Sequence, residues 1–515
     1  MEKIFLEAVH LHKEGNLKEA KEKYYEVLSF DKFNINSYNN LGAIYAQEGF
    51  YEKAFQNFNI AITLKADHTE AWFNKGNLLY NLQNFKESIF SFTEAINLRP
   101  NYIEALLKRS DALFEIGSYE QALQDSNLVI SLDSTCAEAW LNKGNALDGM
   151  MMLEEALFCY DRAIQLDHNF FESWSNKGKI YHTLQRFDEA IQCFDKAIKI
   201  NPYYYEAYFN KSFTQLLLGN FIEGWKNYEF RLQTKKFKNT LRHSNIKLAK
   251  DINDIKQKKL LIWSDEGFGD TIQMIRLVKL LPIYTSNIIL EVHKDLKNLI
   301  KNSFPYCRVI ENGESYSDAD CQIPLMSLIS VLNLTLDSIP KDVPYLKIEE
   351  NLVSKWSVNL KIKKEKLNIG IACSGNNLYR EDKIRSLDLH YFKPLLKMSN
   401  LFLIQKEIKS LDKEFLLSHP EIIFLGCQIN SFSDTAAIVQ NMDLIISIDT
   451  SLTHLAGSLG KRTFVLLNWP HDHRWLLNQD KSYWYPSVKI FRKEFNQSWD
   501  LLIKNLISNY VQKKI

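Results

Sequence analysis

A 34-residue period governs the first 238 residues of this 515-residue chain. When the sequence is cut every 34 residues from Met1, without gaps, similar side chains return to the same places in seven repeats. Small residues occupy the eighth position of every repeat: Ala8, Gly42, Gly76, Ser110, Gly144, Gly178 and Ser212. Aromatic residues occupy most twenty-fourth positions: Tyr24, Phe58, Phe92, Tyr160, Phe194 and Tyr228. This period predicts stacked helical pairs, because one pair alone cannot bury its apolar face.

The pattern resembles the tetratricopeptide repeat over residues 1–238, which implies an α-solenoid of seven helical pairs with a concave groove for peptides or proteins. Asparagine recurs at the sixth position, which we expect to face the groove: Asn40, Asn74, Asn142, Asn176 and Asn210. An amide both donates and accepts hydrogen bonds, so this row is suited to a peptide backbone. The row is similar to the asparagine ladder of the O-linked N-acetylglucosamine transferase solenoid. The alternative is that asparagine is common at this position whatever the repeats bind.

Charge and cysteine content exclude several protein classes. The chain has 63 Lys+Arg and 62 Asp+Glu, and the resulting net charge of +1 argues against a nucleic-acid partner. Seven scattered cysteines without a CxxC pair predict a reduced protein without a zinc site. The first residues predict a helix rather than a signal peptide, and no run approaches the ~20 apolar residues of a membrane span. We therefore expect a soluble, cytoplasmic protein.

The sequence changes character after residue 238. Residues 239–257 are polar and charged without a helical stripe, which predicts a linker. Short apolar runs beyond it predict buried strands at residues 260–263, 287–292, 367–373, 401–405, 443–448 and 463–469. Amphipathic segments separate these runs. The alternation predicts parallel sheets with helices on both faces, whose ligands bind at the carboxyl ends of the strands.

Two strand-to-helix junctions carry candidate site residues. At the first, Glu266–Thr271 turns into a predicted helix over residues 272–281, and Gly267 and Gly269 permit a tight turn near a ligand. At the second, Asp449–His454 begins a helix rich in small residues. The first N–H groups of such a helix lie at the positive end of its dipole, so they are suited to bind phosphate. Hydroxyls of Thr450, Ser451 and Thr453 would assist.

Residues 258–515 contain segments that resemble the glycosyltransferase half of bacterial tetratricopeptide proteins related to the ADP-heptose heptosyltransferases, glycosyltransferase family nine. These segments are EGFGDTIQMIR, SIPKDVPYL, SGNNLYREDKIRSL, DTSLTHLAGSLG, HDHRWLL and SYWYPSVKIFR. The resemblance implies the α/β GT-B fold, with two Rossmann-like lobes facing a cleft. The acceptor-side lobe would span residues 258–360, and the donor nucleotide-sugar-binding lobe residues 361–515. The resemblance also implies an inverting, metal-independent transfer without a cofactor.

The resemblance assigns roles to particular residues. The aspartate of the family's glycine–aspartate turn is the general base, which implies that role for Asp270; a helix cap is the alternative. The donor-diphosphate segment corresponds to Asp449, Thr450, Ser451 and His454, and the alternative there is a capped helix with a core histidine. Arg385 corresponds best to the family's phosphate-binding basic residue.

Three further assignments concern the donor and metals. Lys383 lies beside Arg385 and could neutralise the leaving diphosphate. Gln405 ends a strand where nucleotide contacts are expected, although a solvated strand end is equally consistent. Asp318 and Asp320 form a DxD pair of the kind that binds metal in another glycosyltransferase fold. They precede a segment that matches the present family, so we expect no metal there.

The sequence thus predicts a glycosyltransferase that moves a sugar from a nucleotide-diphosphate donor to an acceptor hydroxyl, on a polypeptide recruited by the repeats. One alternative is a transferase for a saccharide or lipid-linked acceptor, with the repeats as a tether. Another is a non-catalytic repeat adaptor with a degenerate GT-B half. Five retained residues argue against such decay: Gly269, Asp270, Asp449, Thr450 and His454.

Overall fold

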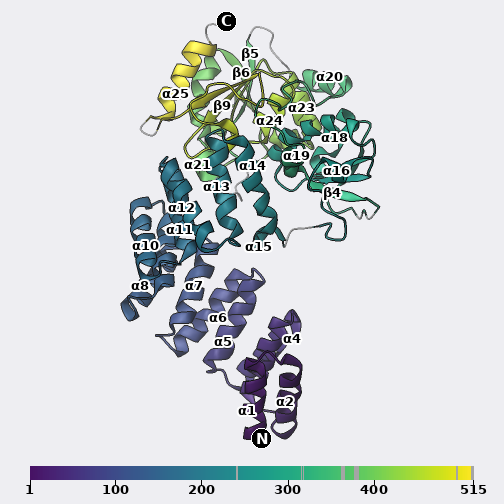
Figure 1. The fold of residues 1–515 in the computed structure, drawn as a ribbon. Coiled ribbons are helices and arrows are strands. Elements are labelled where there is room, and N and C mark those ends of the chain that lie inside the picture. Colours follow the sequence, from purple (N-terminus) through teal and green to yellow (C-terminus); the bar gives the residue numbers. More distant parts are fainter. Residues whose placement is uncertain are drawn as a thin grey trace. The chain divides into compact units, whose positions relative to one another are not determined.

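The computed structural model describes residues 1–238, 242–314, 316, 318–360, 366–375, 382–494 and 497–511. By internal packing the chain divides into two compact units, Met1–Ala207 and Tyr208–Ile515. Helices alone make up the first unit, whereas strands and helices together make up the second (Figure 1). None of the helices within the described ranges combines the length and apolar character that a membrane span needs.

The first unit is a row of helical pairs, and the first helix of each pair begins at the first residue of its predicted repeat or one residue later. The helices are α1 (Glu2–Lys13), α2 (Leu17–Phe30), α3 (Ile35–Gln47), α4 (Tyr51–Leu64), α5 (Thr69–Asn81), α6 (Phe85–Leu98), α7 (Ile103–Glu115), α8 (Tyr119–Leu132), α9 (Ala137–Gly149), α10 (Leu153–Leu166), α11 (Phe171–Thr183) and α12 (Phe187–Ile200). The 34-residue frame therefore predicts the helix positions of this unit correctly.

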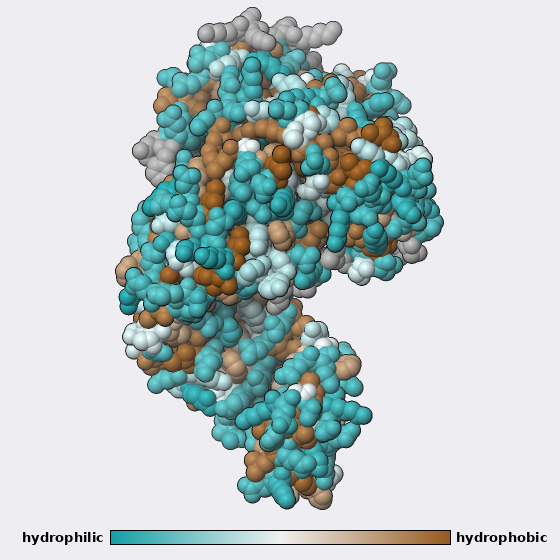
Figure 2. Space-filling model, in the orientation of Figure 1, coloured by the Kyte–Doolittle hydropathy of each residue, from teal (hydrophilic) through white to brown (hydrophobic). Residues whose placement is uncertain are grey.

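Contacts between glycines and aromatic rings explain the two most regular positions of the repeat. A Cβ atom added at the eighth-position glycine would lie 2.6 to 2.8 Å from the twenty-fourth-position ring in four repeats: Gly42 with Phe58, Gly76 with Phe92, Gly144 with Tyr160, and Gly178 with Phe194. The missing side chain thus lets the two helices of a repeat pack closely. On the face shown in Figure 2, the repeat helices present mainly hydrophilic residues with apolar ones interspersed.

The second unit begins within the seventh repeat. This repeat comprises α13 (Tyr205–Leu217), α14 (Phe221–Tyr228), the 3₁₀ helix η1 (Glu229–Gln233) and α15 (Lys235–Lys238). Phe221, Trp225 and Tyr228 belong to the same apolar core as the strands that follow. The unusual Gly224 is required here, because a Cβ atom would lie 2.7 Å from the side chain of Leu216. The seventh repeat therefore packs as part of the α/β unit.

Two sheets with only parallel strand pairs form the frame of the second unit. The first contains β1 (Leu260–Trp263), β2 (Ile288–Val292), β3 (Arg308–Glu311) and β4 (Cys321–Pro324) in the order β3-β2-β1-β4. The second contains β5 (Leu367–Ala372), β6 (Ser399–Leu403), β7 (Ile422–Phe424), β8 (Leu444–Ile448), β9 (Thr463–Leu467) and β10 (Val488–Arg492) in the order β10-β9-β8-β5-β6-β7. The order reverses between β1 and β4 and between β5 and β8, and such points bind ligands at the carboxyl ends of strands.

Helices connect these strands. They are α16 (Ile252–Ile255), α17 (Phe268–Met274), α18 (Lys297–Ser303), α19 (Leu328–Val331), α20 (Glu350–Asn359), α21 (Asp382–Arg385), α22 (Ser410–Ser418), α23 (Phe432–Gln440), α24 (Ser451–Ser458) and α25 (Trp499–Leu506). The other helical segments are the 3₁₀ helices η2 (Ile275–Ile283), η3 (Lys294–Leu296), η4 (Leu325–Ser327), η5 (Leu389–Lys397), η6 (Gly426–Gln428) and η7 (His473–Trp475), and the π-helix η8 (Ile507–Val511). The helix predicted over residues 272–281 begins earlier, at Phe268, and continues as 3₁₀ helix from Ile275.

The predicted linker is a packed part of the first sheet from residue 242 onward. Leu248 forms a parallel bridge with Gln322 of β4, and the backbone N–H of Ala249 donates to the Gln322 carbonyl at 2.9 Å. Ile246 packs on Leu261 and Ile289 of the sheet. The polar composition of this segment concealed these contacts, because one bridge and a few apolar side chains leave no periodic pattern.

Candidate active site

The two predicted junctions meet in the second unit. Helix α17 follows β1, helix α24 follows β8, and the two helices pack against each other. A Cβ atom on Gly269 would lie 3.0 Å from His454 Cδ2 and 3.7 Å from Ser451 Cα. Neither Gly267 nor Gly269 has a positive φ, so the turn itself does not require glycine. Gly269 is needed instead for the close approach of α17 to α24.

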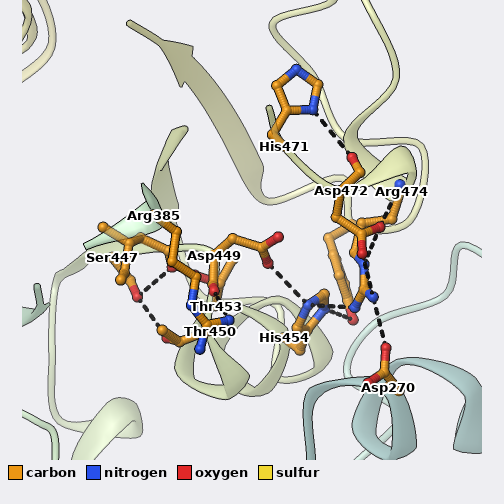
Figure 3. Close-up of polar contacts among 12 residues, drawn as sticks. Asp270, Arg385, Ser447, Asp449, Thr450, Thr453, His454, His471, Asp472 and Arg474 are labelled. Atoms are coloured by element: carbon orange, nitrogen blue, oxygen red, sulfur yellow. Dashed lines mark hydrogen bonds and ion pairs between the residues drawn. The ribbon is translucent and has the colours of Figure 1, made fainter. Parts of the chain in front are cut away.

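Asp270 lies in the first turn of α17 and binds an arginine from the loop after β9. Arg474 Nη2 donates to Asp270 Oδ1 at 2.7 Å, and Arg474 Nε donates to Asp472 Oδ1 at 2.8 Å (Figure 3). Gly267 is the N-cap residue of α17, so Asp270 is not its cap. The carboxylate of Asp270 is only 22% exposed. No spacing in the sequence indicates this pairing, because the two residues lie 204 positions apart.

His454 extends this network to Asp449 and Tyr485. Arg474 Nη1 lies 3.1 Å from His454 Nε2 and must donate, since a guanidinium has no acceptor. Nε2 is therefore unprotonated, which assigns the proton to Nδ1, where it is donated to the Tyr485 hydroxyl at 3.0 Å. Asp449 Oδ1 lies 3.5 Å from the same Nε2. One guanidinium thus links Asp270, Asp472 and the Asp449–His454 pair.

Burial and charge shift the pKa values of this network. Burial lowers the pKa of His454, so its ring is neutral at pH 7. Burial alone would raise the pKa of Asp449, but the nearby charge of Arg474 opposes burial, and that pKa lies below its ordinary value. The pKa of Asp472 is likewise lowered, because the charge of Arg474 overcomes burial. Both carboxylates therefore remain charged at neutral pH.

The start of α24 presents backbone N–H groups without a side-chain cap. Thr450 is the N-cap residue and makes no capping hydrogen bond. Its Oγ1 lies instead 3.1 Å from Ser447 Oγ, and Thr453 Oγ1 donates to the Ile448 carbonyl at 2.8 Å. These two hydroxyls thus bond to β8 and its end rather than pointing to a ligand. The backbone N–H groups of this uncapped first turn are therefore the groups at this junction that are suited to bind an anion.

Arg385 lies beside the same helix start. Its Nη1 donates to the Asp449 carbonyl at 3.0 Å, and its Nε donates to Asp382 Oδ1 at 3.0 Å. A Cβ atom on Gly375 would lie 2.3 Å from Arg385 Nη2, so the guanidinium packs against the chain that follows β5. Arg385 is therefore held between the ends of β5 and β8, where the strand order reverses. Lys383 belongs to α21, and its side chain lies outside the described residues, as does Arg380.

Gln405 has no free amide group for a nucleotide. Its Oε1 accepts from the backbone N–H of Cys373 at 2.9 Å and of Ser374 at 3.3 Å. Its Nε2 donates to Ser374 Oγ at 2.8 Å and to the Glu407 carbonyl at 2.9 Å. Both acceptor and both donor positions are thus used. This geometry favours a role in joining the ends of β5 and β6.

The asparagines of the repeats bond within the protein. Asn74 Nδ2 donates to Asn39 Oδ1 at 3.0 Å, and Asn176 Nδ2 donates to Asn145 Oδ1 at 2.8 Å, each on the preceding repeat. Asn142 is buried and donates to the Leu107 carbonyl at 3.2 Å. The remaining two are half-buried: Asn40, which donates to the Tyr24 hydroxyl at 3.0 Å, and Asn210 on α13. For Asn74, Asn142 and Asn176, the amide N–H groups join neighbouring repeats.

Asp318 and Asp320 lie away from these junctions. The backbone N–H of Lys259 donates to Asp320 Oδ2 at 2.8 Å, and the Lys259 ammonium pairs with Asp318. Lys259 directly precedes β1, so both carboxylates are at the amino-terminal edge of the first sheet. The site described above is at the carboxyl ends of the strands.

Comparison with known families identifies the repeats. The tetratricopeptide repeat family matches residues 69–102, 137–170 and 171–204, and related tetratricopeptide repeat families match residues 35–68 and 193–226. These segments are tetratricopeptide repeats. Four of the five matched ranges begin where the 34-residue frame places a repeat, so both the type of repeat and its register are confirmed.

Individual proteins show only low similarity to this chain. Protein FlbA of Caulobacter vibrioides is 22% identical over 315 residues, which are 55% of this chain and 51% of FlbA. The chain thus spans about half the length of this curated relative. YrrB, described as a TPR protein with an unusual peptide-binding site, is 21% identical with a TM-score of 0.31, over 36% of this chain and 95% of YrrB. A tetratricopeptide repeat protein of Parabacteroides merdae is 14% identical with a TM-score of 0.42, over 47% of this chain and 94% of that protein. No functional argument rests on similarities this low.

Proposed function

We propose that the second unit is a GT-B glycosyltransferase that moves a sugar from a nucleotide-diphosphate donor to an acceptor hydroxyl, with inversion. The observation that carries this proposal is the position of Asp270. Its carboxylate accepts a hydrogen bond from Arg474 Nη2 at 2.7 Å, and its helix α17 packs against α24, whose start is uncapped. A proton acceptor and an anion-binding helix start thus lie together. Two parallel sheets, each with a reversal of strand order, support the assignment to this fold.

In this reaction Asp270 takes the proton of the acceptor hydroxyl as its oxygen attacks the anomeric carbon. The bond from that carbon to the diphosphate oxygen breaks on the opposite face, which inverts the configuration. Negative charge then grows on the diphosphate, where the first N–H groups of α24 and the guanidinium of Arg385 stabilise it. Arg474 orients the Asp270 carboxylate.

The acceptor that we propose is a polypeptide recruited by the repeats, because tetratricopeptide arrays present extended surfaces to other proteins. The amide N–H groups of Asn74, Asn142 and Asn176 already bond to neighbouring repeats. Recognition of a peptide backbone would therefore use their remaining acceptor positions or other groove side chains. A saccharide or lipid-linked acceptor, with the repeats as a tether, is the alternative.

The test is a thermal-shift panel of ADP-, UDP-, GDP- and CMP-linked sugars with the full chain. A ligand that binds only the folded state raises the unfolding temperature in proportion to ln(1 + [L]/Kd). We expect one nucleotide class to stabilise the wild type and to stabilise Arg385→Met less. Arg99→Met, which removes an exposed ion pair with Glu70, is the matched control and should respond like the wild type. Absence of stabilisation by every donor would contradict the proposal.

A further inference from the structure

We propose that the seventh repeat supports the two segments that carry the candidate active site and that Arg231 is a positioning residue for the turn that carries Asp270. The inference rests on the proposed function for its catalytic consequence, but its structural part can be tested separately. Two sets of contacts support it. One reaches the turn after β1, and the other reaches the loop after β9 that carries Arg474.

Arg231 of η1 makes the first set of contacts. Its Nη2 donates to Asp265 Oδ2 at 2.8 Å and to Ser327 Oγ at 2.9 Å, while its Nη1 donates to Glu229 Oε1 at 2.9 Å. The guanidinium also lies over the ring of Tyr228, 4.6 Å from its centroid. Arg231 is only 1% exposed, so this fork of hydrogen bonds is shielded from water.

Asp265 links Arg231 to the turn that carries Asp270. It follows β1 by two residues and precedes Asp270 by five, and its side chain is fully buried. Its Oδ1 accepts from the backbone N–H of Met326 at 3.1 Å, just beyond β4. One carboxylate therefore fixes the carboxyl ends of β1 and β4, between which the strand order of the first sheet reverses. Arg231 holds this carboxylate from the repeat side.

Aromatic side chains of the seventh repeat make the second set of contacts. The ring of His473 packs against Phe213, Trp225 and Tyr228, with centroid distances of 5.7, 5.9 and 6.4 Å. His473 directly precedes Arg474, the partner of Asp270. The same repeat thus supports both members of the Asp270–Arg474 pair, one through Asp265 and the other through His473.

The departures of this repeat from the ordinary pattern agree with that role. Gly224 stands where the other repeats have alanine or serine, and Trp225 is the largest side chain at a position that holds lysine in the first repeat and phenylalanine, isoleucine or leucine in the next five. Trp225 is 2% exposed and shares a core with the strands of the first sheet. Burial raises the pKa of Tyr228 above its ordinary value, and the charges of Glu266 and Asp270 act in the same direction. A repeat used only for recruitment would not need these residues.

The test compares Arg231→Lys with the control Arg99→Lys, which alters an exposed ion pair in the first unit. Lysine keeps the charge but loses the fork, so we expect amide exchange of residues 264–274 to become faster by about tenfold or more, with β6 and β9 unchanged. Transfer should lose kcat by about 10²-fold with little change in the donor KM, because a small misplacement of a reacting group is costly. Ser327→Ala, which deletes only one of the Arg231 hydrogen bonds, should act in the same direction if Arg231→Lys fails to fold.

Unchanged exchange at residues 264–274 in both variants would overturn the inference. Faster exchange with a wild-type kcat would also overturn it, because Arg231 would then be merely structural. If the wild type transfers no sugar from any donor, the proposed function fails, whereas the exchange result still decides whether Arg231 holds the turn. Failure of the inference and failure of the proposed function are thus distinguishable.

Discussion

Arg474 Nη2 lies 2.7 Å from Asp270 Oδ1, although 204 residues separate the two in sequence. Asp270 comes from the helix after β1, and Arg474 from the loop after β9, so the contact joins the two sheets of the second unit. Arg474 also binds Asp472 and His454. The candidate base is therefore held by a buried charge network rather than by its own helix.

Loss of Arg474 should destabilise the second unit. The Arg474→Met variant leaves Asp270 and Asp472 without their shared guanidinium, and removal of one partner from a buried ion pair costs about 3–5 kcal/mol. Urea unfolding followed by tryptophan fluorescence measures the change. Arg99→Met removes an exposed pair and should leave the unfolding free energy nearly unchanged. Equal losses of unfolding free energy for the two substitutions would contradict a stabilising role of this network.

The two glycines of the first junction should respond differently to alanine. A Cβ on Gly269 would lie 3.0 Å from the His454 ring, whereas a Cβ on Gly267 would have Asp270 Oδ2 at 3.4 Å as its nearest neighbour. We expect Gly269→Ala to cost about 1–3 kcal/mol by overpacking, and Gly267→Ala to cost less. Urea unfolding of both variants decides the matter, and an equally large loss for Gly267→Ala would contradict this packing.

Stability should fall as pH is lowered from 7 to 5. Burial lowers the pKa of His473 below its ordinary value of 6.5, so the unfolded chain binds more protons between the folded-state pKa and 6.5. Each such histidine contributes a slope of at most about 1.4 kcal/mol per pH unit. The lowered pKa values of Asp449 and Asp472 act only at more acid pH, below about 3.8.

His473→Phe should reduce this loss on acidification. Phenylalanine keeps the ring contacts with Phe213 and Trp225 and removes the proton. His454 and His471, whose pKa values burial also lowers, remain in the variant, so the slope decreases without vanishing. Unfolding free energies at pH 5, 6 and 7 measure the slope of stability with pH. The control is His10→Phe, on the exposed face of α1. A variant with the wild-type slope would refute this assignment.

The boundary of the folded second unit should lie before the seventh repeat. A chain that begins at Asn201 keeps α13, α14 and Arg231, and we expect it to melt cooperatively as a monodisperse species. A chain that begins at Arg242 leaves Asp265 buried without its partner and exposes the core that Trp225 covers, so we expect it to aggregate. Size-exclusion chromatography and thermal melting separate the two outcomes. Equal behaviour of both chains would argue against an integral seventh repeat.

The repeats were predictable because their structure is local. In four repeats the glycine at the eighth position meets a ring sixteen residues later, so a period in the sequence reports a contact directly, as for Gly42 and Phe58. Six of the ten strands within the described residues were predictable for a similar reason, since buried parallel strands appear as short apolar runs, whereas β3, β4, β7 and β10 were not predicted. The positions of β1 and β8 could therefore be predicted closely from sequence.

The contacts of the candidate site were not predictable in the same way. Asp270 and Arg474 are joined by tertiary folding, and no spacing in the sequence relates them. The amide of Gln405 seemed suited to a nucleotide, but only the fold reveals that Cys373 and Ser374 use it. The segment after residue 241 looked like a linker, because the single bridge of Leu248 to Gln322 leaves no pattern.

The most direct test of the central claim measures donor binding and sugar transfer by Asp270→Asn. The amide keeps the shape of the side chain but cannot take the proton of the acceptor, so we expect transfer to fall by about 10²-fold or more with nearly unchanged donor affinity. Asp480→Asn removes an exposed carboxylate of the same unit and should transfer like the wild type. An Asp270→Asn variant that transfers at the wild-type rate would contradict Asp270 as the base, and with it this account of the site.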